Sequence, residues 1–114
     1  MNRIAIFEEF PNERWNALSA AERKAWAVRL INGALTEIRN SGLEPDKWES
    51  YCLANAVNCL ATGMFATASK EVEYAAAPAT DRSQVFVAKT PKMSLDALYR
   101  ALIQASKGAD RYCD

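Results

Sequence analysis

The chain has 114 residues, half of them apolar and a quarter charged, and its 14 basic residues balance its 14 acidic ones. This length suffices for one hydrophobic core, and the balanced charge argues against non-specific binding to nucleic acid or to an anionic membrane surface. The chain has no histidine, which excludes histidine-based triads, histidine general bases and nearly all zinc sites that use histidine. We therefore predict one domain, 1–114, with no nucleic-acid or membrane partner.

The N-terminal segment differs from a secretory signal peptide. Its apolar stretch at 3–7, RIAIF, is short and is followed by two glutamates, and no small-residue cleavage site comes after it. The other apolar runs are too short to span a bilayer. We therefore expect a cytoplasmic protein. The next segment, PNERWNAL at 11–18, predicts a short helix that places Trp15 and Leu18 on the core.

The strongest helix signal begins at Ser19. The sequence Ser-Ala-Ala-Glu at 19–22 predicts a capping box, in which the hydroxyl of Ser19 accepts from the amide of Glu22 while the carboxylate of Glu22 accepts from the amide of Ser19. Apolar residues then recur with helical spacing as far as Asn40, and Gly42 lies where a left-handed residue would end the helix. The predicted apolar stripe consists of Trp26, Ala27, Leu30, Ile31, Ala34, Leu35 and Ile38.

The region 45–77 is also predicted to be helical, as either one helix or two. Pro45 suits the first helical turn, and we expect this helix to lie antiparallel beside the preceding one. A single helix over this region would be about 50 Å long, more than a compact domain of this size accommodates. Length therefore favours a break near Thr62 and Gly63, although the glycine alone costs a helix only about 1 kcal/mol.

With that break, the segment 48–78 resembles a tetratricopeptide-repeat hairpin. Small, glycine, aromatic, alanine, bulky, alanine and proline positions follow one another in the order of that family. The residues that carry the resemblance are Ala56, Gly63, Phe65, Ala68, Val72, Ala75 and Pro78. The resemblance covers this segment only, since no second copy is found at the repeat length of the family. It implies binding of a peptide or another protein.

The segment 79–94 is the one stretch without a helical period, and we expect an irregular loop there. Within it, 84–89 has the β-branched and aromatic content of a short strand. Two alternatives stay open: a two-stranded ribbon that pairs 84–89 with 3–7, or an unpaired mobile loop. In the unpaired loop, an apolar binding site would be formed by Val85, Phe86 and Val87.

The last helix is predicted to begin after Ser94, which is a favoured N-cap residue. Gly108 is expected to close it, and 109–114 to form a frayed tail. The predicted buried stripe consists of Leu95, Leu98, Tyr99, Leu102, Ile103 and Ala105.

No catalytic, metal or cofactor site can be assembled from the sequence. Cys52 and Cys59 would lie on one helical face about 10 Å apart, which exceeds the roughly 7 Å limit for a disulfide, so they are expected to be small core residues. Cys113 is expected to be an exposed thiol. The chain lacks a CxxC pair, a dinucleotide-binding or Walker A glycine loop and a nucleophile elbow, and its neighbouring carboxylates do not converge on one point.

We predict an all-α fold of four or five helices packed as antiparallel hairpins. The expected function is binding of another protein or of a second copy, as an adaptor, an inhibitor or a homodimer, without catalysis. The candidate partner-binding residues, on the concave side of the hairpin and in the loop, are Tyr51, Asn55, Phe65, Val85, Phe86 and Val87. The alternative is a small-molecule-binding protein or histidine-free enzyme with a pocket between helices. Its polar groups would come from Tyr51, Asn55 or Cys59.

Overall fold

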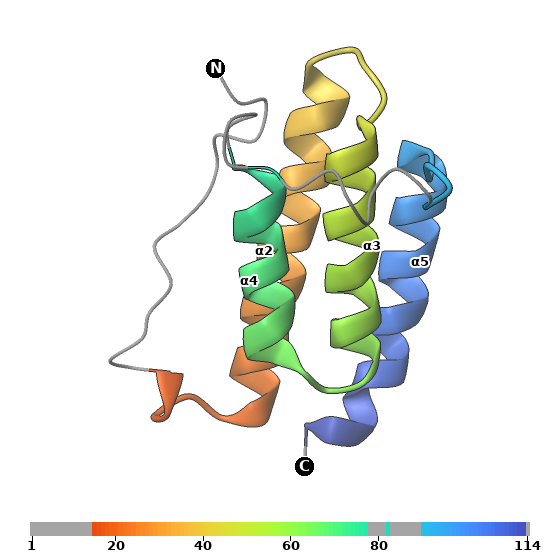
Figure 1. The fold of residues 1–114 in the computed structure, drawn as a ribbon. Helices are drawn as coiled ribbons and strands as arrows, with labels where there is room; N and C mark the ends of the chain where they lie inside the picture. Colours follow the sequence, from red (N-terminus) through yellow and green to blue (C-terminus); the bar gives the residue numbers. More distant parts are fainter. Residues whose placement is uncertain (1–14, 78–81, 83–89, 114) are drawn as a thin grey trace.

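Four α-helices account for most of the part of the chain that the computed structural model describes, residues 15–77, 82 and 90–113. They are α2 (Ala20–Asn40), α3 (Lys47–Ala61), α4 (Phe65–Ala75) and α5 (Leu95–Gly108), and a 3-10 helix, η3 (Ala109–Tyr112), follows α5 (Figure 1). The described residues contain no strand, which confirms the predicted all-α fold. The ribbon predicted between 3–7 and 84–89 lies outside them. Within the described ranges, every helix is too short or too polar to traverse a bilayer.

The N-terminal ends of α2 and α3 are fixed by the same local device. At α2 the predicted capping box is present, with Ser19 Oγ 3.1 Å from the amide of Glu22 and the reverse contact at 3.0 Å. At α3 an equivalent box joins Asp46 and Glu49, with distances of 2.8 and 2.9 Å. Pro45 precedes this cap and is buried, so its prediction as a first-turn residue was wrong by two positions.

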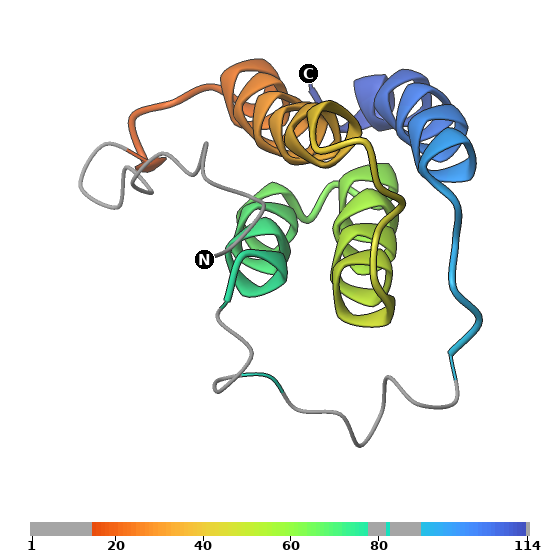
Figure 2. The same cartoon turned by 90° about the horizontal axis from the view of Figure 1, so that it is seen from above.

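The helices form a four-helix bundle in which α2 and α5 make one layer and α3 and α4 the other (Figure 2). The chain runs alternately up and down, so α2 and α3 are antiparallel as predicted. However, α2 packs mainly on α4 and α5, and its contact with α3 is slight. The six residues between α2 and α3 can cross the bundle diagonal, whereas only three residues join α3 to α4, which therefore pack side by side.

One apolar core lies between the two layers. Every α-helix contributes to it, because each repeats its apolar residues with helical spacing on one face. The largest fully buried apolar side chains are those of Ile31, Leu35, Ile38, Leu53, Leu60, Leu98 and Val72. The stripe predicted for α5 is correct at Leu98, Leu102 and Ala105 but wrong at Ile103, which is 56% exposed on the outer face.

The predicted break between α3 and α4 occurs at Gly63, which has a φ of +79°. The amide of Gly63 donates to the carbonyl of Leu60 and the amide of Met64 to the carbonyl of Cys59, so the turn is a Schellman motif. A side chain at Gly63 would also meet the ring of Tyr112, because an added Cβ would lie 2.7 Å from its nearest ring carbon. Glycine is therefore required here for conformation and for packing.

The segment after Gly108 is ordered as far as Cys113, which differs from the predicted frayed tail. Gly108 has a right-handed φ of -64°, so it does not terminate the helix as a left-handed cap, and the chain continues directly into η3. Ala109 is fully buried in the core, and Tyr112 packs on the α3–α4 turn. These tertiary contacts hold a segment whose local sequence predicts fraying.

Replacing Gly63 with alanine should destabilise the protein more than the same change at Gly42. Both glycines have a similar positive φ, of +79° and +76°, which costs an alanine roughly 1–2 kcal/mol. Only Gly63 meets another side chain, since nothing lies within 4 Å of a Cβ at Gly42. Urea unfolding should show an additional loss of about 1 kcal/mol or more for Gly63→Ala.

In a protein that already carries Tyr112→Ala, the additional loss should disappear. Gly63→Ala, compared with the Tyr112→Ala single variant, should then cost no more stability than Gly42→Ala. Equal losses for Gly63→Ala and Gly42→Ala would contradict the packing of the Tyr112 ring on this turn.

Candidate functional site

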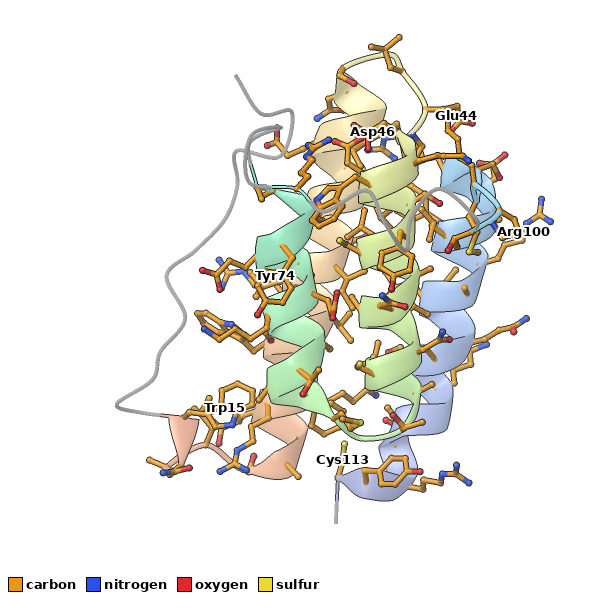
Figure 3. All side chains as sticks on the ribbon, viewed as in Figure 1. Trp15, Glu44, Asp46, Tyr74, Arg100 and Cys113 are labelled. Atoms are coloured by element: carbon orange, nitrogen blue, oxygen red, sulfur yellow. The ribbon has the colours of Figure 1, made fainter. Side chains whose placement is uncertain are left out.

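One end of the bundle carries the α3–α4 turn, and we call this end the base. An open pocket lies there. It has a volume of about 260 Å³ and is lined by Trp15, Arg23 and the segment 63–67. The turn and the first residues of α4 form one wall, while Trp15 and the first part of α2 form the other. Figure 3 shows Trp15 and Cys113 at this end, opposite Glu44 and Asp46.

Large apolar side chains are exposed beside this pocket. Met64 is 52% exposed and Tyr112 is 39% exposed, and the Tyr112 ring packs on Gly63, the residue next to Met64 in the chain. Phe65 also lines the pocket, and it is buried, with only 5% of its surface exposed. We call Trp15, Met64, Phe65 and Tyr112 the base patch.

An arginine stacks on an aromatic ring at each side of the base patch. The guanidinium of Arg23 lies 5.3 Å from the centroid of Trp15, and its Nε donates to the backbone carbonyl of Trp15 at 3.1 Å. The guanidinium of Arg111 lies 5.0 Å from the centroid of Tyr112. Cation–π contacts of this kind hold an arginine in place while its outer N–H groups stay available to a ligand.

Three further charged side chains and a helix end contribute to the electrostatics of the base. Lys24 forms an ion pair with Asp110, which joins α2 to η3 and neutralises both side chains. The carboxylate of Glu22 accepts from the amide of Ser19, and this hydrogen bond lowers its pKa. Met64, the N-cap residue of α4, makes no side-chain hydrogen bond to the first turn, so the partial positive charge of this helix end is not offset by a cap.

The structure separates the predicted partner-binding residues. Tyr51 and Asn55 lie on α3, one turn apart and partly exposed, whereas Phe65 lies at the base. The loop residues Val85, Phe86 and Val87 lie outside the described part of the chain. The hairpin therefore does not bring its three described candidates into one surface, and only Phe65 lines the pocket.

Asn55 on α3 forms a polar contact with Glu71 on α4. Burial raises the pKa of Glu71 on α4, and hydrogen bonding to the Asn55 amide offsets part of that rise. Burial also raises the pKa of the Cys52 thiol to about 12, with Glu71 adding to the effect, and raises the pKa of Cys59 for the same reasons. Both thiols are therefore protonated and unreactive near neutral pH.

The cysteines agree only partly with the sequence predictions. Cys52 is buried and unpaired, as predicted, while Cys59 and Cys113 are partly buried free thiols. The expectation of an exposed Cys113 is wrong, because the residue is partly buried at the end of η3 and its thiol donates to the carbonyl of Ala109 at 3.5 Å. Across residues 15–77, 82 and 90–113, no group of cysteine and carboxylate side chains could hold a metal ion.

Polar contacts at the end opposite the base fasten the connection between α4 and α5. Arg82 donates to the carbonyl of Ala77 at 2.9 Å and to the carboxylate of Asp46 at 3.0 Å. Buried Ser50 accepts from the amide of Met93 at 2.7 Å. These groups therefore have structural partners within the protein.

Sequence analysis missed most of the base. Phe65 was among the predicted partner-binding residues, whereas Arg111 and Tyr112 fell within the segment predicted to be a frayed tail. Arg23 and Trp15 are far from Met64 in sequence, and their meeting depends on the packing of α2 against α4.

No protein-family model matches the chain, and comparison with curated proteins and with solved structures finds no significant similarity. The evidence for a function therefore comes from the geometry and charge of the base.

Replacing Glu71 with glutamine should stabilise the protein at neutral pH. Because the pKa of Glu71 is raised on folding, the protonated carboxyl favours the folded state. This contribution to the free energy of unfolding is complete below the pKa of Glu71 in the unfolded chain, and it is lost as the pH rises through the pKa of Glu71 in the folded protein. Glutamine removes the buried charge and keeps a polar group beside Asn55. The urea midpoint of Glu71→Gln should exceed that of the parent at pH 7.5, and the difference should vanish near pH 4.

Glu73→Gln is the matched control on α4, because Glu73 is partly exposed and pairs with Lys70 at 3.5 Å. This change should leave the stability difference between the two pH values nearly unaltered. An equal gain in both variants, or a Glu71→Gln gain that persists at pH 4, would show that burial of the Glu71 carboxylate is not the cause.

Proposed function

We propose that this protein is a non-catalytic interaction domain, an adaptor or inhibitor that binds another protein through the base patch. The observation that carries the proposal is the exposure of Met64, which lines the pocket, and of Tyr112, which packs on the neighbouring Gly63. Exposed apolar patches with a polar rim are typical of protein-binding surfaces, and aromatic residues, methionine and arginine are enriched at their centres. The free cysteines of the described residues agree with a cytoplasmic location as part of this proposal.

The dimensions of the pocket favour a protein partner over a small molecule. At about 260 Å³ it is smaller than the roughly 300–1,000 Å³ typical of small-molecule sites, and it is open to solvent on one side. None of the polar groups suggested for a ligand pocket, Tyr51, Asn55 and Cys59, lines it. A pocket of this kind accommodates one anchoring side chain from a protein surface.

The resemblance of 48–78 to a tetratricopeptide-repeat hairpin remains part of the proposal. Support comes from the short antiparallel α3–α4 pair and from the burial of its small residues. The buried alanines of this pair are Ala56, Ala68 and Ala75. A peptide or protein partner would agree with this resemblance, which by itself does not specify the binding surface.

The proposal is tested by quantitative pull-down of the tagged protein and of Met64→Asp from a lysate of the source organism. A charged side chain at the centre of the base patch should reduce recovery of the partner at least about tenfold, since it opposes burial of the patch. Aspartate is a favoured N-cap residue, so this change should not weaken α4. Circular dichroism should confirm that helicity is unchanged.

Leu43→Asp is the matched control. Leu43 is 63% exposed, but it lies in the α2–α3 connection at the opposite end of the bundle, so its replacement should leave recovery unchanged. Recovery that is insensitive to Met64→Asp would contradict binding at the base. A Phe86→Asp variant tests the predicted loop site in parallel.

A further inference from the structure

We infer that the base patch binds a segment of a partner protein in which acidic residues flank one large apolar side chain. This inference rests on the proposed function and specifies the chemistry of the partner. It depends on two sets of contacts: the pocket that Met64 and Phe65 help to line, and the stacked arginines Arg23 and Arg111.

The pocket would receive the apolar side chain. Trp15, Met64 and Phe65 line it together with Arg23 and Thr67, so it offers apolar contacts beside polar ones. Methionine is flexible enough to adapt to several anchor shapes, and aromatic walls give a large contact area. We therefore expect the pocket to accept leucine, methionine or an aromatic residue as the anchor, and not one residue type alone.

The flanking charges would be recognised by the arginines. Arg23 lines the pocket, and its hydrogen bond to the Trp15 carbonyl uses the Nε donor. Arg111 is exposed on the other side of the patch and stacks on Tyr112. The uncapped end of α4 adds partial positive charge, while Lys24 and Asp110 neutralise each other and the Glu22 carboxylate is bound to the Ser19 amide. A planar guanidinium held on a ring is well suited to bind a carboxylate through two hydrogen bonds.

The same charges disfavour a second copy of this chain as the occupant. A symmetric dimer through the base would bring each copy's patch against the identical patch of the other. Such an interface would hold two stacked arginines from each copy, and this accumulation of like charge is costly. An acidic segment removes this repulsion, so charge complementarity selects it over self-association.

The inference is tested by selecting a displayed library of random peptides on the immobilised full-length protein. Recovered peptides should be enriched in aspartate and glutamate within a few positions of a leucine, methionine or aromatic residue, compared with the unselected library. The affinity of the best peptide should fall about tenfold in Arg23→Gln and about two- to fivefold in Arg111→Gln, and it should weaken with added salt.

Arg100→Gln is the matched control, because Arg100 is an exposed arginine on α5 away from the base (Figure 3). It should leave the affinity unchanged. Selection of no peptide, of peptides without acidic enrichment, or of peptides equally sensitive to Arg100→Gln would overturn the inference. A concentration-dependent dimer that Met64→Asp dissociates would also overturn it, in favour of a second copy.

Failure of the inference and failure of the proposed function give different results. If Met64→Asp abolishes capture of the partner from the lysate but the selected peptides are not acidic, the base still binds proteins and only the partner chemistry is wrong. If the lysate partner is insensitive to Met64→Asp, the proposed function itself fails.

Discussion

The contact between the ring of Tyr112 and Gly63 connects the two halves of the base. It requires a residue without a side chain at the α3–α4 turn, where the backbone also has a positive φ. The contact holds η3 against the α3–α4 turn, and Arg111 stacks on the same ring, close to the turn that carries Met64. A larger residue at position 63 would displace the ring and separate the apolar surface from one of its flanking charges.

The two ends of the bundle differ in how their polar groups are used. At the upper end in Figure 3, the carboxylate of Glu44 accepts from the amide of Leu95, and the carboxylate of Asp46 accepts from Arg82. These charged groups therefore hold the α4–α5 connection in place. At the base, two arginines stack on rings beside exposed apolar side chains. The net charge of zero does not reveal this difference, because it is the sum of the charges at both ends.

Local signals in the sequence were sufficient for the helices and for the break at Gly63. The Ser19 capping box, the spacing of apolar residues and the length argument depend only on neighbouring residues, and the structure agrees with each of them. The diagonal placement of α2 and α3 and the ordering of η3 depend on contacts between distant segments, which periodicity does not reveal. Phe65 was identified because an aromatic follows the turn, whereas Arg23 joins the site only through the packing of α2 against α4.

The central claim is that the base is the binding surface. Hydrogen–deuterium exchange of the full-length protein, alone and with its captured partner, tests this claim directly, because it reports where backbone amides become protected on binding. We predict that protection increases in 62–67 and in 109–113, which contain the turn, the first residues of α4 and η3. Protection confined to the outer face of α3 around Tyr51 and Asn55, with the base unchanged, would contradict the claim.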